Sequence, residues 1–268
     1  MEYFNTDDGV QRGMFLREGN GEIGFGDALG SPVRTLRAGQ DFPERRNVGV
    51  YGPGFTDPQF GVRGRMSRRG DVIRLGPTLL NDSLNWAGFP TNLKRPRLTL
   101  DRDGKRIFDR TGNDFDVEVP AGTRTYRLGA DLDRGPLQAL STRVTCEWTF
   151  RSGTVGGDAW KPLPLSAVRF LPPLSGENAA PAGNTFVIPF EVQRQPGSAA
   201  GTVRELTVEV SYDDGATWRP ASVLRLRQQG VAVVRHPAGP GFASLRARST
   251  DSAGNTLSET IIRAYRLA

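Results

Sequence analysis

The chain has 268 residues, of which 37% are hydrophobic and 24% are charged, and its net charge is +6. Its single histidine and single cysteine exclude an intrachain disulfide, a zinc site of paired thiolates and a metal centre built from several histidines. The 33 glycines and 19 prolines, without the period of collagen, predict many short strands joined by tight turns. No run of apolar residues is long enough to cross a membrane.

Residues 1 to 160 form the first of two predicted domains, a β-sandwich with long loops. Its opening lacks the basic and apolar segments of a signal peptide, which leaves either a cytosolic protein or a piece of a longer secreted chain. Basic clusters occur at residues 45–46 and 63–69. They have neither the interleaved aromatics of a single-strand surface nor a helix for a groove, so we expect a solvated face and no nucleic-acid partner.

Alternation of apolar and polar residues marks the later strands, and no segment keeps a helical period, which predicts an all-β fold. In residues 143–151 the side chains of Val144, Cys146, Trp148 and Phe150 share one face, so Cys146 is expected in the core. Further strands are predicted within 98–100, 115–119, 186–192, 206–212, 243–247 and 259–265.

The best domain boundary lies at residues 160–166, where two spaced prolines favour an extended linker. The following residues, 166–268, hold about seven strands, the size of an immunoglobulin- or fibronectin-like β-sandwich. We therefore predict two consecutive β-sandwich domains.

A turn motif follows the strand that ends near residue 212. Its spacing, S-x-D-x-G-x-T-W, is that of the Asp-box hairpins found in sialidases and many secreted modules. An aspartate there accepts hydrogen bonds from the amides of its own turn, glycine supplies a positive φ, and the tryptophan is expected to be largely buried. The motif residues are structural: Ser211, Asp213, Gly215, Thr217 and Trp218.

The sequence contains no catalytic motif that we recognise. His236 is the only histidine, it precedes a Pro/Gly turn, and no Gly-x-Ser-x-Gly elbow accompanies it. The turn carboxylates Asp101 and Asp103 have no calcium-loop spacing, so turn formation is the simpler interpretation. We expect no catalytic residue, no metal and no cofactor, although an enzyme of unrecognised type stays a minor alternative.

Several phrases in chain order resemble the region that follows the catalytic domain in large secreted subtilisin-like serine peptidases of actinobacteria. The phrases span residues 140–153, 164–170, 180–183, 192–195, 206–218, 239–247, 250–255 and 260–265, and residues 3–6 and 37–39 resemble the beginning of that region. The stretch that carries the catalytic serine in that family is absent from this chain. The resemblance therefore implies a secreted, non-catalytic accessory region.

Two hypotheses follow from the resemblance. The first is an accessory region that supports folding, substrate holding or partner binding, with a subtilisin-like catalytic domain or another secreted protein as partner. The second is a stand-alone secreted module that binds cell-wall glycan or a partner protein. In both, the aromatic- and arginine-rich loops of residues 40–95 are the expected binding surface, because those residue types are common interface anchors.

Overall fold

A computed structural model describes residues 11–12, 15–19, 25–30, 34–35, 47–55, 66–89, 94–135 and 138–268. Within these ranges every regular element is a β-strand, which confirms the predicted all-β fold. No helix able to cross a membrane occurs in this part of the chain.

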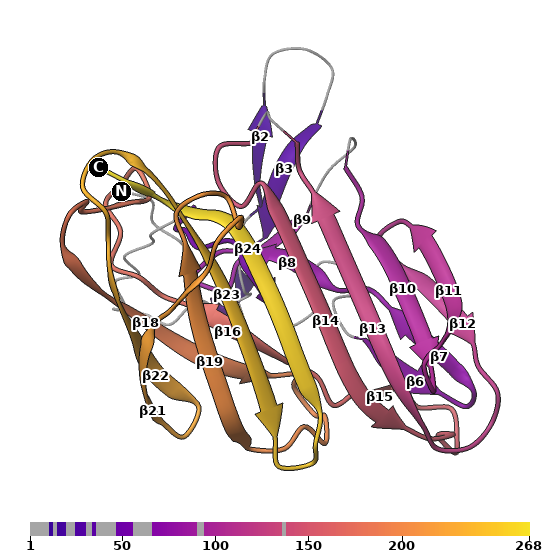
Figure 1. Cartoon of the computed structure of the whole chain (residues 1–268). Coiled ribbons are helices and arrows are strands. Elements are labelled where there is room, and N and C mark those ends of the chain that lie inside the picture. The colour runs from indigo at the N-terminus through magenta and orange to yellow at the C-terminus, as the bar shows by residue number, and fades with distance from the viewer. Residues whose placement is uncertain are drawn as a thin grey trace.

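A nine-stranded sheet runs through the whole molecule (Figure 1). Its strand order is β11-β10-β13-β14-β24-β23-β19-β20, and β17 pairs in parallel with β24. Its strands are β10 (Arg97–Arg102), β11 (Lys105–Thr111), β13 (Arg124–Asp133), β14 (Arg143–Ser152), β17 (Ala179–Ala180), β19 (Val203–Ser211), β20 (Arg219–Pro220), β23 (Gly241–Asp251) and β24 (Thr256–Leu267).

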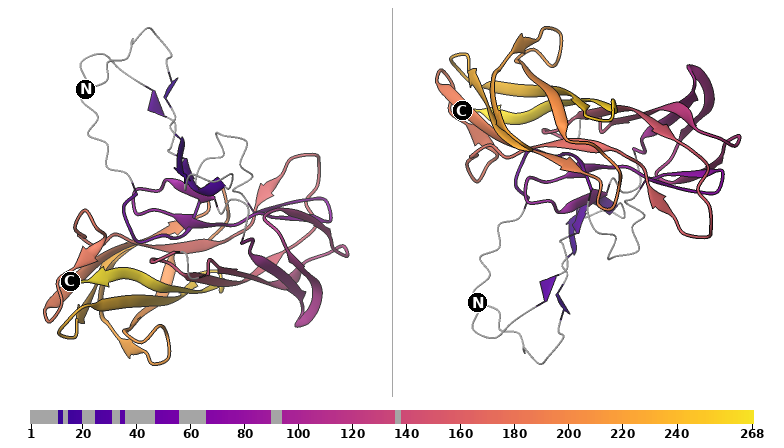
Figure 2. Two further views of the ribbon diagram at one scale, coloured as in Figure 1. Left: turned by 90° about the horizontal axis from the view of Figure 1, so that it is seen from above. Right: turned by 90° about the horizontal axis from the view of Figure 1, so that it is seen from below.

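A second sheet packs against the β24-β23-β19 end of the first and completes an immunoglobulin-like sandwich. Its order is β16-β18-β22-β21, from β16 (Ser166–Phe170), β18 (Thr185–Arg194), β22 (Gln229–Arg235) and β21 (Ser222–Leu226). This arrangement matches the immunoglobulin fold in two respects. One sheet has the four strands β16, β18, β22 and β21, and in the facing sheet the short strand β17 pairs in parallel with the last strand, β24. The layers are seen from two further directions in Figure 2.

The other end of the long sheet is covered by a four-stranded sheet of order β12-β7-β6-β15. Its strands are β12 (Phe115–Glu118), β7 (Val72–Leu75), β6 (Ser67–Arg69) and β15 (Lys161–Pro162). The remaining strands pair as β5 (Gly52–Gly54) with β8 (Thr78–Asn81), β2 (Phe15–Gly19) with β3 (Phe25–Gly30) and β9 (Ala87–Phe89), and β1 (Gln11–Arg12) with β4 (Arg34–Thr35).

The two predicted domains are joined more closely than a linker at residues 160–166 suggests. Strand β14 of the first pairs with β24 of the second from Arg143↔Ile262 to Thr149↔Thr256. Buried side chains from both halves, including Trp148 and Cys146, form one continuous core. Alternation in the sequence reports which face of a strand is buried but not which strand lies beside it, so this shared sheet could not be read from the pattern. Whether each half folds alone stays a prediction.

Candidate functional site

Polar side chains of the immunoglobulin-like sandwich bind the main chain of earlier residues. Arg169, on β16, is buried, and its Nη1 donates to the carbonyl oxygens of Gly52 at 3.1 Å and Pro53 at 2.7 Å. Its Nη2 donates to the carbonyl oxygens of Asn81 at 3.2 Å and Asp82. One guanidinium therefore joins β5 and the end of β8 to the sandwich.

Two glutamines at the end of β18 act in the same way. The Oε1 of Gln193 accepts from the N–H of Phe55 at 2.9 Å, and its Nε2 donates to the carbonyl of Phe55 at 2.7 Å. Gln195 accepts from the N–H of Met66 at 3.0 Å and donates to the carbonyls of Met66 at 2.8 Å and Leu163 at 2.7 Å. Each amide thus takes the place of a neighbouring strand. We call Arg169, Gln193 and Gln195 the seam.

A buried carboxyl, Glu259 on β24, lies close to the seam. Its Oε2 accepts from the N–H of Val168 at 3.0 Å, while its Oε1 has no hydrogen-bond partner in the described part of the chain. Burial raises the pKa of Glu259 to about 8, against the hydrogen bond from Val168 and the positive charge of Arg169. Burial likewise lowers the pKa of Arg169 to about 10. These opposed shifts show how costly it is to keep charge in this part of the core.

A second buried acid, Asp82, organises the turn that presents its carbonyl to the seam. Its Oδ1 accepts from the N–H groups of Leu84 and Trp86, both at 2.9 Å. Burial raises the pKa of Asp82, partly offset by these main-chain donors and by Arg169. The side chain therefore caps its own turn, as short acidic side chains commonly do.

The seam was not predicted from the sequence. One signal was available: in the run 165–170, Arg169 stands among Ala167, Val168 and Phe170, where a β-strand buried on both faces leaves no room for a solvated charge. An arginine in such a run needs several buried acceptors. Its partners come from residues far away in the sequence, so their identity could not be predicted.

The residues of the predicted turn motif lie together between β19 and β20. Ser211 Oγ donates to Asp213 Oδ1 at 2.7 Å and accepts from the N–H of Gly215 at 2.8 Å. Asp213 accepts from Thr217 twice, from the N–H at 2.8 Å and from the hydroxyl at 2.5 Å. These bonds from Thr217, together with that from Ser211, lower the pKa of Asp213 to about 2. Gly215 has φ of +89°, a conformation that glycine adopts readily.

Trp218, which was expected to be largely buried, is partly buried beside the hairpin. Its Nε1 donates to the carbonyl of Gly215 at 3.0 Å, and the guanidinium of Arg246 lies 4.4 Å from the ring centroid. Strand β20 is two residues long and ends its sheet, so one ring face is covered by an arginine and not by a further strand.

The single histidine is packed in the core of the protein. His236 is 2% exposed, its Nδ1 lies 2.8 Å from the carbonyl of Pro181, and its Nε2 lies 3.1 Å from the hydroxyl of Tyr265. Burial lowers its pKa, although the contact with Pro181 opposes that change. Within the described ranges no three His, Cys, Asp or Glu side chains are placed to hold a metal ion.

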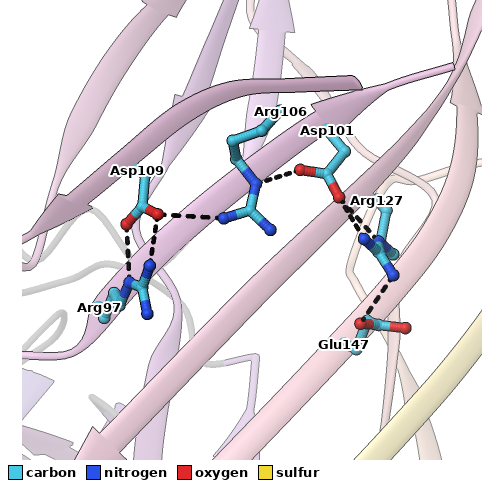
Figure 3. A network of polar contacts seen from close by, with 6 residues as sticks. All are labelled: Arg97, Asp101, Arg106, Asp109, Arg127 and Glu147. Atoms are coloured by element: carbon cyan, nitrogen blue, oxygen red, sulfur yellow. Dashed lines mark hydrogen bonds and ion pairs between the residues drawn. The ribbon is translucent and has the colours of Figure 1, made fainter. Parts of the chain in front are cut away.

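The outer face of the long sheet carries a network of ion pairs (Figure 3). At its centre Asp101 is bound by Arg106 from β11 and by Arg127 from β13, at 2.5 Å for Arg127 Nη2. Arg106 also pairs with Asp109 at 3.1 Å, and Arg127 reaches Glu147 at 3.7 Å. Asp101 is thus committed to two arginines, which agrees with a structural role for this turn carboxylate.

The loops of residues 40–95, predicted to be the binding surface, are described in part. Their side chains Phe55, Arg68 and Trp86 are buried in the protein's own core, at 3%, 1% and 2% exposure. Arg68 donates to Asp71 at 2.7 Å, and so it is engaged internally. These three side chains are therefore not available at the surface for binding. The clusters at 45–46 and 63–65, and residues 56–62 and 90–93, lie outside the described residues.

No protein-family model and no curated protein matches this chain. Among solved structures the chain is similar to a chimeric titin Z1Z2-Z1Z2 tandem functionalised with a GRGDS exogenous peptide from fibronectin. The identity is 15%, the match covers 80% of this chain and 97% of that chain, and the TM-score is 0.25. At that TM-score the likeness carries no argument, and the immunoglobulin-like assignment rests on the strand order.

Proposed function

We propose that this chain is a non-catalytic accessory region of a secreted subtilisin-like serine peptidase, acting on the folding and stability of the polypeptide joined to it. The supporting observation is that the three seam residues belong to stretches of sequence that carry the resemblance. Arg169 belongs to the phrase at 164–170, and Gln193 and Gln195 belong to the phrase at 192–195. All three bind main-chain groups of residues 52–82 or the preceding linker.

The physical role of such a seam is to hold incoming chain in one conformation. The hydrogen bonds that a side-chain amide or guanidinium forms with main-chain groups do not depend on the side chains of the bound segment. They therefore stabilise whichever strand enters the sandwich from the N-terminal side. An accessory region needs this property if it is to complete the fold of a neighbouring domain.

The engaged ring nitrogens of His236 fit a chain that performs no nucleophilic catalysis itself. A serine hydroxyl stays a poor nucleophile unless a base accepts its proton. Both nitrogens of this imidazole already face partners in the core.

The test compares the chain alone with the chain mixed with a subtilisin-like catalytic domain from the same source. The purified chain is incubated with casein and with a serine-directed fluorophosphonate probe, and then refolded together with the catalytic domain. We expect no cleavage and no labelling by the chain alone, and a higher yield or thermal midpoint of the catalytic domain when the chain is present. Cleavage by the chain alone would defeat the proposal, and so would an unchanged catalytic domain.

The alternative, a stand-alone secreted module that binds cell-wall glycan or a protein, gives a different pattern in the same experiment. It predicts no effect on the catalytic domain but retention of the chain on insoluble cell-wall material or on a secreted partner.

A further inference from the structure

The edge strand β21 differs from β11, an edge strand of the long sheet, in the side chains that it exposes. Leu224 and Leu226 on β21 are 70% and 80% exposed. Strand β11, which ends the long sheet, is lined instead by charged side chains such as Arg106 and Asp109, with Ile107 at 37% exposure. Charges on an edge strand discourage pairing with another strand, whereas an apolar edge invites it.

The main chain of β21 is also open on its outer side. It forms a hairpin with β22 through the two residues Arg227 and Gln228, closed by the pair Leu226↔Gln229. In a two-residue hairpin the closing pair exchanges both main-chain hydrogen bonds, and bonded pairs then alternate along the ladder. The N–H and C=O groups of Val223 and Arg225 therefore point away from β22. No hydrogen bond within the described residues joins them to another element.

A shallow apolar groove adjoins this edge on the outer face of the sheet. Its volume is about 530 Å³, and it includes Leu171, Pro189, Leu224, Leu226 and Val231. The exposed leucines thus continue into a concave apolar surface, able to take alternate side chains of an added strand.

The charge around the edge selects the partner. Arginines stand at 219, 225 and 227, in β21 or close to it in sequence, whereas Arg246 and Arg248 lie on β23 in the other sheet and are paired with Glu209. Arg219 and Arg227, at either end of β21, are exposed, as is Arg204, whose carbonyl accepts from Arg225 at 3.0 Å. One carboxylate, Glu191, lines the groove. A second copy of this chain would bring these arginines against their own kind, which opposes self-pairing.

We propose that β21 binds an extended polypeptide segment by β-strand addition, and that this segment alternates apolar with acidic side chains. Its main chain pairs with Val223 and Arg225. Its apolar side chains lie over Leu224, Leu226 and the groove, and its carboxylates meet the arginines. The inference is independent of the accessory role, because the edge would accept such a strand whichever protein supplies it.

The test uses the full chain and a synthetic fluorescent peptide of about seven residues, the length of an ordinary strand, alternating glutamate with valine. We expect a saturable rise in fluorescence anisotropy that weakens as salt is added. The same peptide with lysine in place of glutamate, or with its ladder-forming amides N-methylated, should bind at least about tenfold more weakly.

The matched variant is L224K/L226K, whose side chains are exposed, and its control is I107K on the opposite edge strand. The first should abolish binding and the second should leave it unchanged, with equal thermal midpoints for both proteins. Failure of the glutamate peptide to bind, equal binding of the lysine or N-methylated peptide, or full binding by L224K/L226K would each overturn the proposal. A wild-type dimer in sedimentation that L224K/L226K dissolves would assign the edge to a second copy instead.

Discussion

On the inner side of the nine-stranded sheet, Glu259 and the neighbouring Arg169 are sealed in the core and bonded to main-chain groups. On its outer side, Asp101, itself only 3% exposed, is held by Arg106 and Arg127, whose side chains are 43% and 49% exposed. The same types of ionisable group therefore meet main-chain groups on one face and partly exposed side chains on the other.

The difference lies in what replaces a lost partner. On the outer face water can solvate an arginine whose carboxylate has been removed, so exposed ion pairs contribute little. On the inner face the residues whose carbonyls surround Arg169 are buried, and removing their donor costs the desolvation of each group. Loss of inner charges should therefore change the free energy of unfolding more than loss of outer ones.

The largest effect is expected for Arg169→Leu. The substitution leaves the carbonyls of Gly52, Pro53, Asn81 and Asp82 without this donor. The free energy of unfolding should fall by about 3 kcal/mol or more, a value typical of broken buried networks. Urea unfolding measures it.

The control for Arg169→Leu is Arg248→Leu, because Arg248 is an outer-face arginine of 52% side-chain exposure, paired with Glu209. That variant should lose less than about 1 kcal/mol. Equal losses for the two variants would remove the distinction between the faces.

The next effect concerns the pH dependence of stability. The pKa of Glu259 is raised from 4.5 to about 8 in the folded chain. Between those values the unfolded chain has released a proton that the folded chain retains, so stability falls as pH rises through this window and levels off above it. Glu259→Gln cannot ionise, and it should remove this part of the fall.

Thermal midpoints of wild type and Glu259→Gln across that pH range test the assignment. The variant should gain of the order of 1 kcal/mol or more over wild type at the alkaline end. Asp82, whose pKa is also raised, is unchanged in both proteins and cancels from the difference. Parallel profiles for the two proteins would show that Glu259 ionises in the folded state as easily as in the unfolded one.

The sequence predicted which side chains of a strand are buried, but it did not predict the contacts between distant residues. The alternation of Val144, Cys146, Trp148 and Phe150 correctly places these side chains in the core, because burial on one face depends only on period two. The all-β class and an immunoglobulin-like second half follow from the same kind of local signal.

The seam and the shared sheet depend on contacts between distant residues. Phe55 meets Gln193 and Met66 meets Gln195 across more than a hundred positions, and nothing local to either partner specifies the other. The burial of two aromatic side chains in the loops of residues 40–95 was missed for a related reason. The pattern shows that Phe55 and Trp86 are aromatic but not that the sandwich covers them.

A smaller effect is expected for Asp101→Asn on the outer face. Burial raises the pKa of Asp101, but the hydrogen bonds from Arg106 and Arg127 outweigh it and leave the pKa below 3.8. The carboxylate therefore adds stability above that pH, and this contribution is lost as the pH falls from 3.8 through the lowered pKa. The amide variant should lose about 1 kcal/mol at neutral pH and little in acid. A loss that persists undiminished in acid would mean that packing, not charge, holds Asp101.

The smallest effect belongs to an exposed bidentate pair, Arg143 with Asp131. The bonds are short, at 2.9 and 2.6 Å, but the side chains are 54% and 39% exposed. A double-mutant cycle with Arg143→Ala and Asp131→Ala isolates the pair from the effects of each truncation. Its coupling energy should be within about 0.5 kcal/mol and should vanish in high salt. A larger, salt-resistant coupling would place this pair with the inner charges, and exposure would no longer explain why the two faces differ.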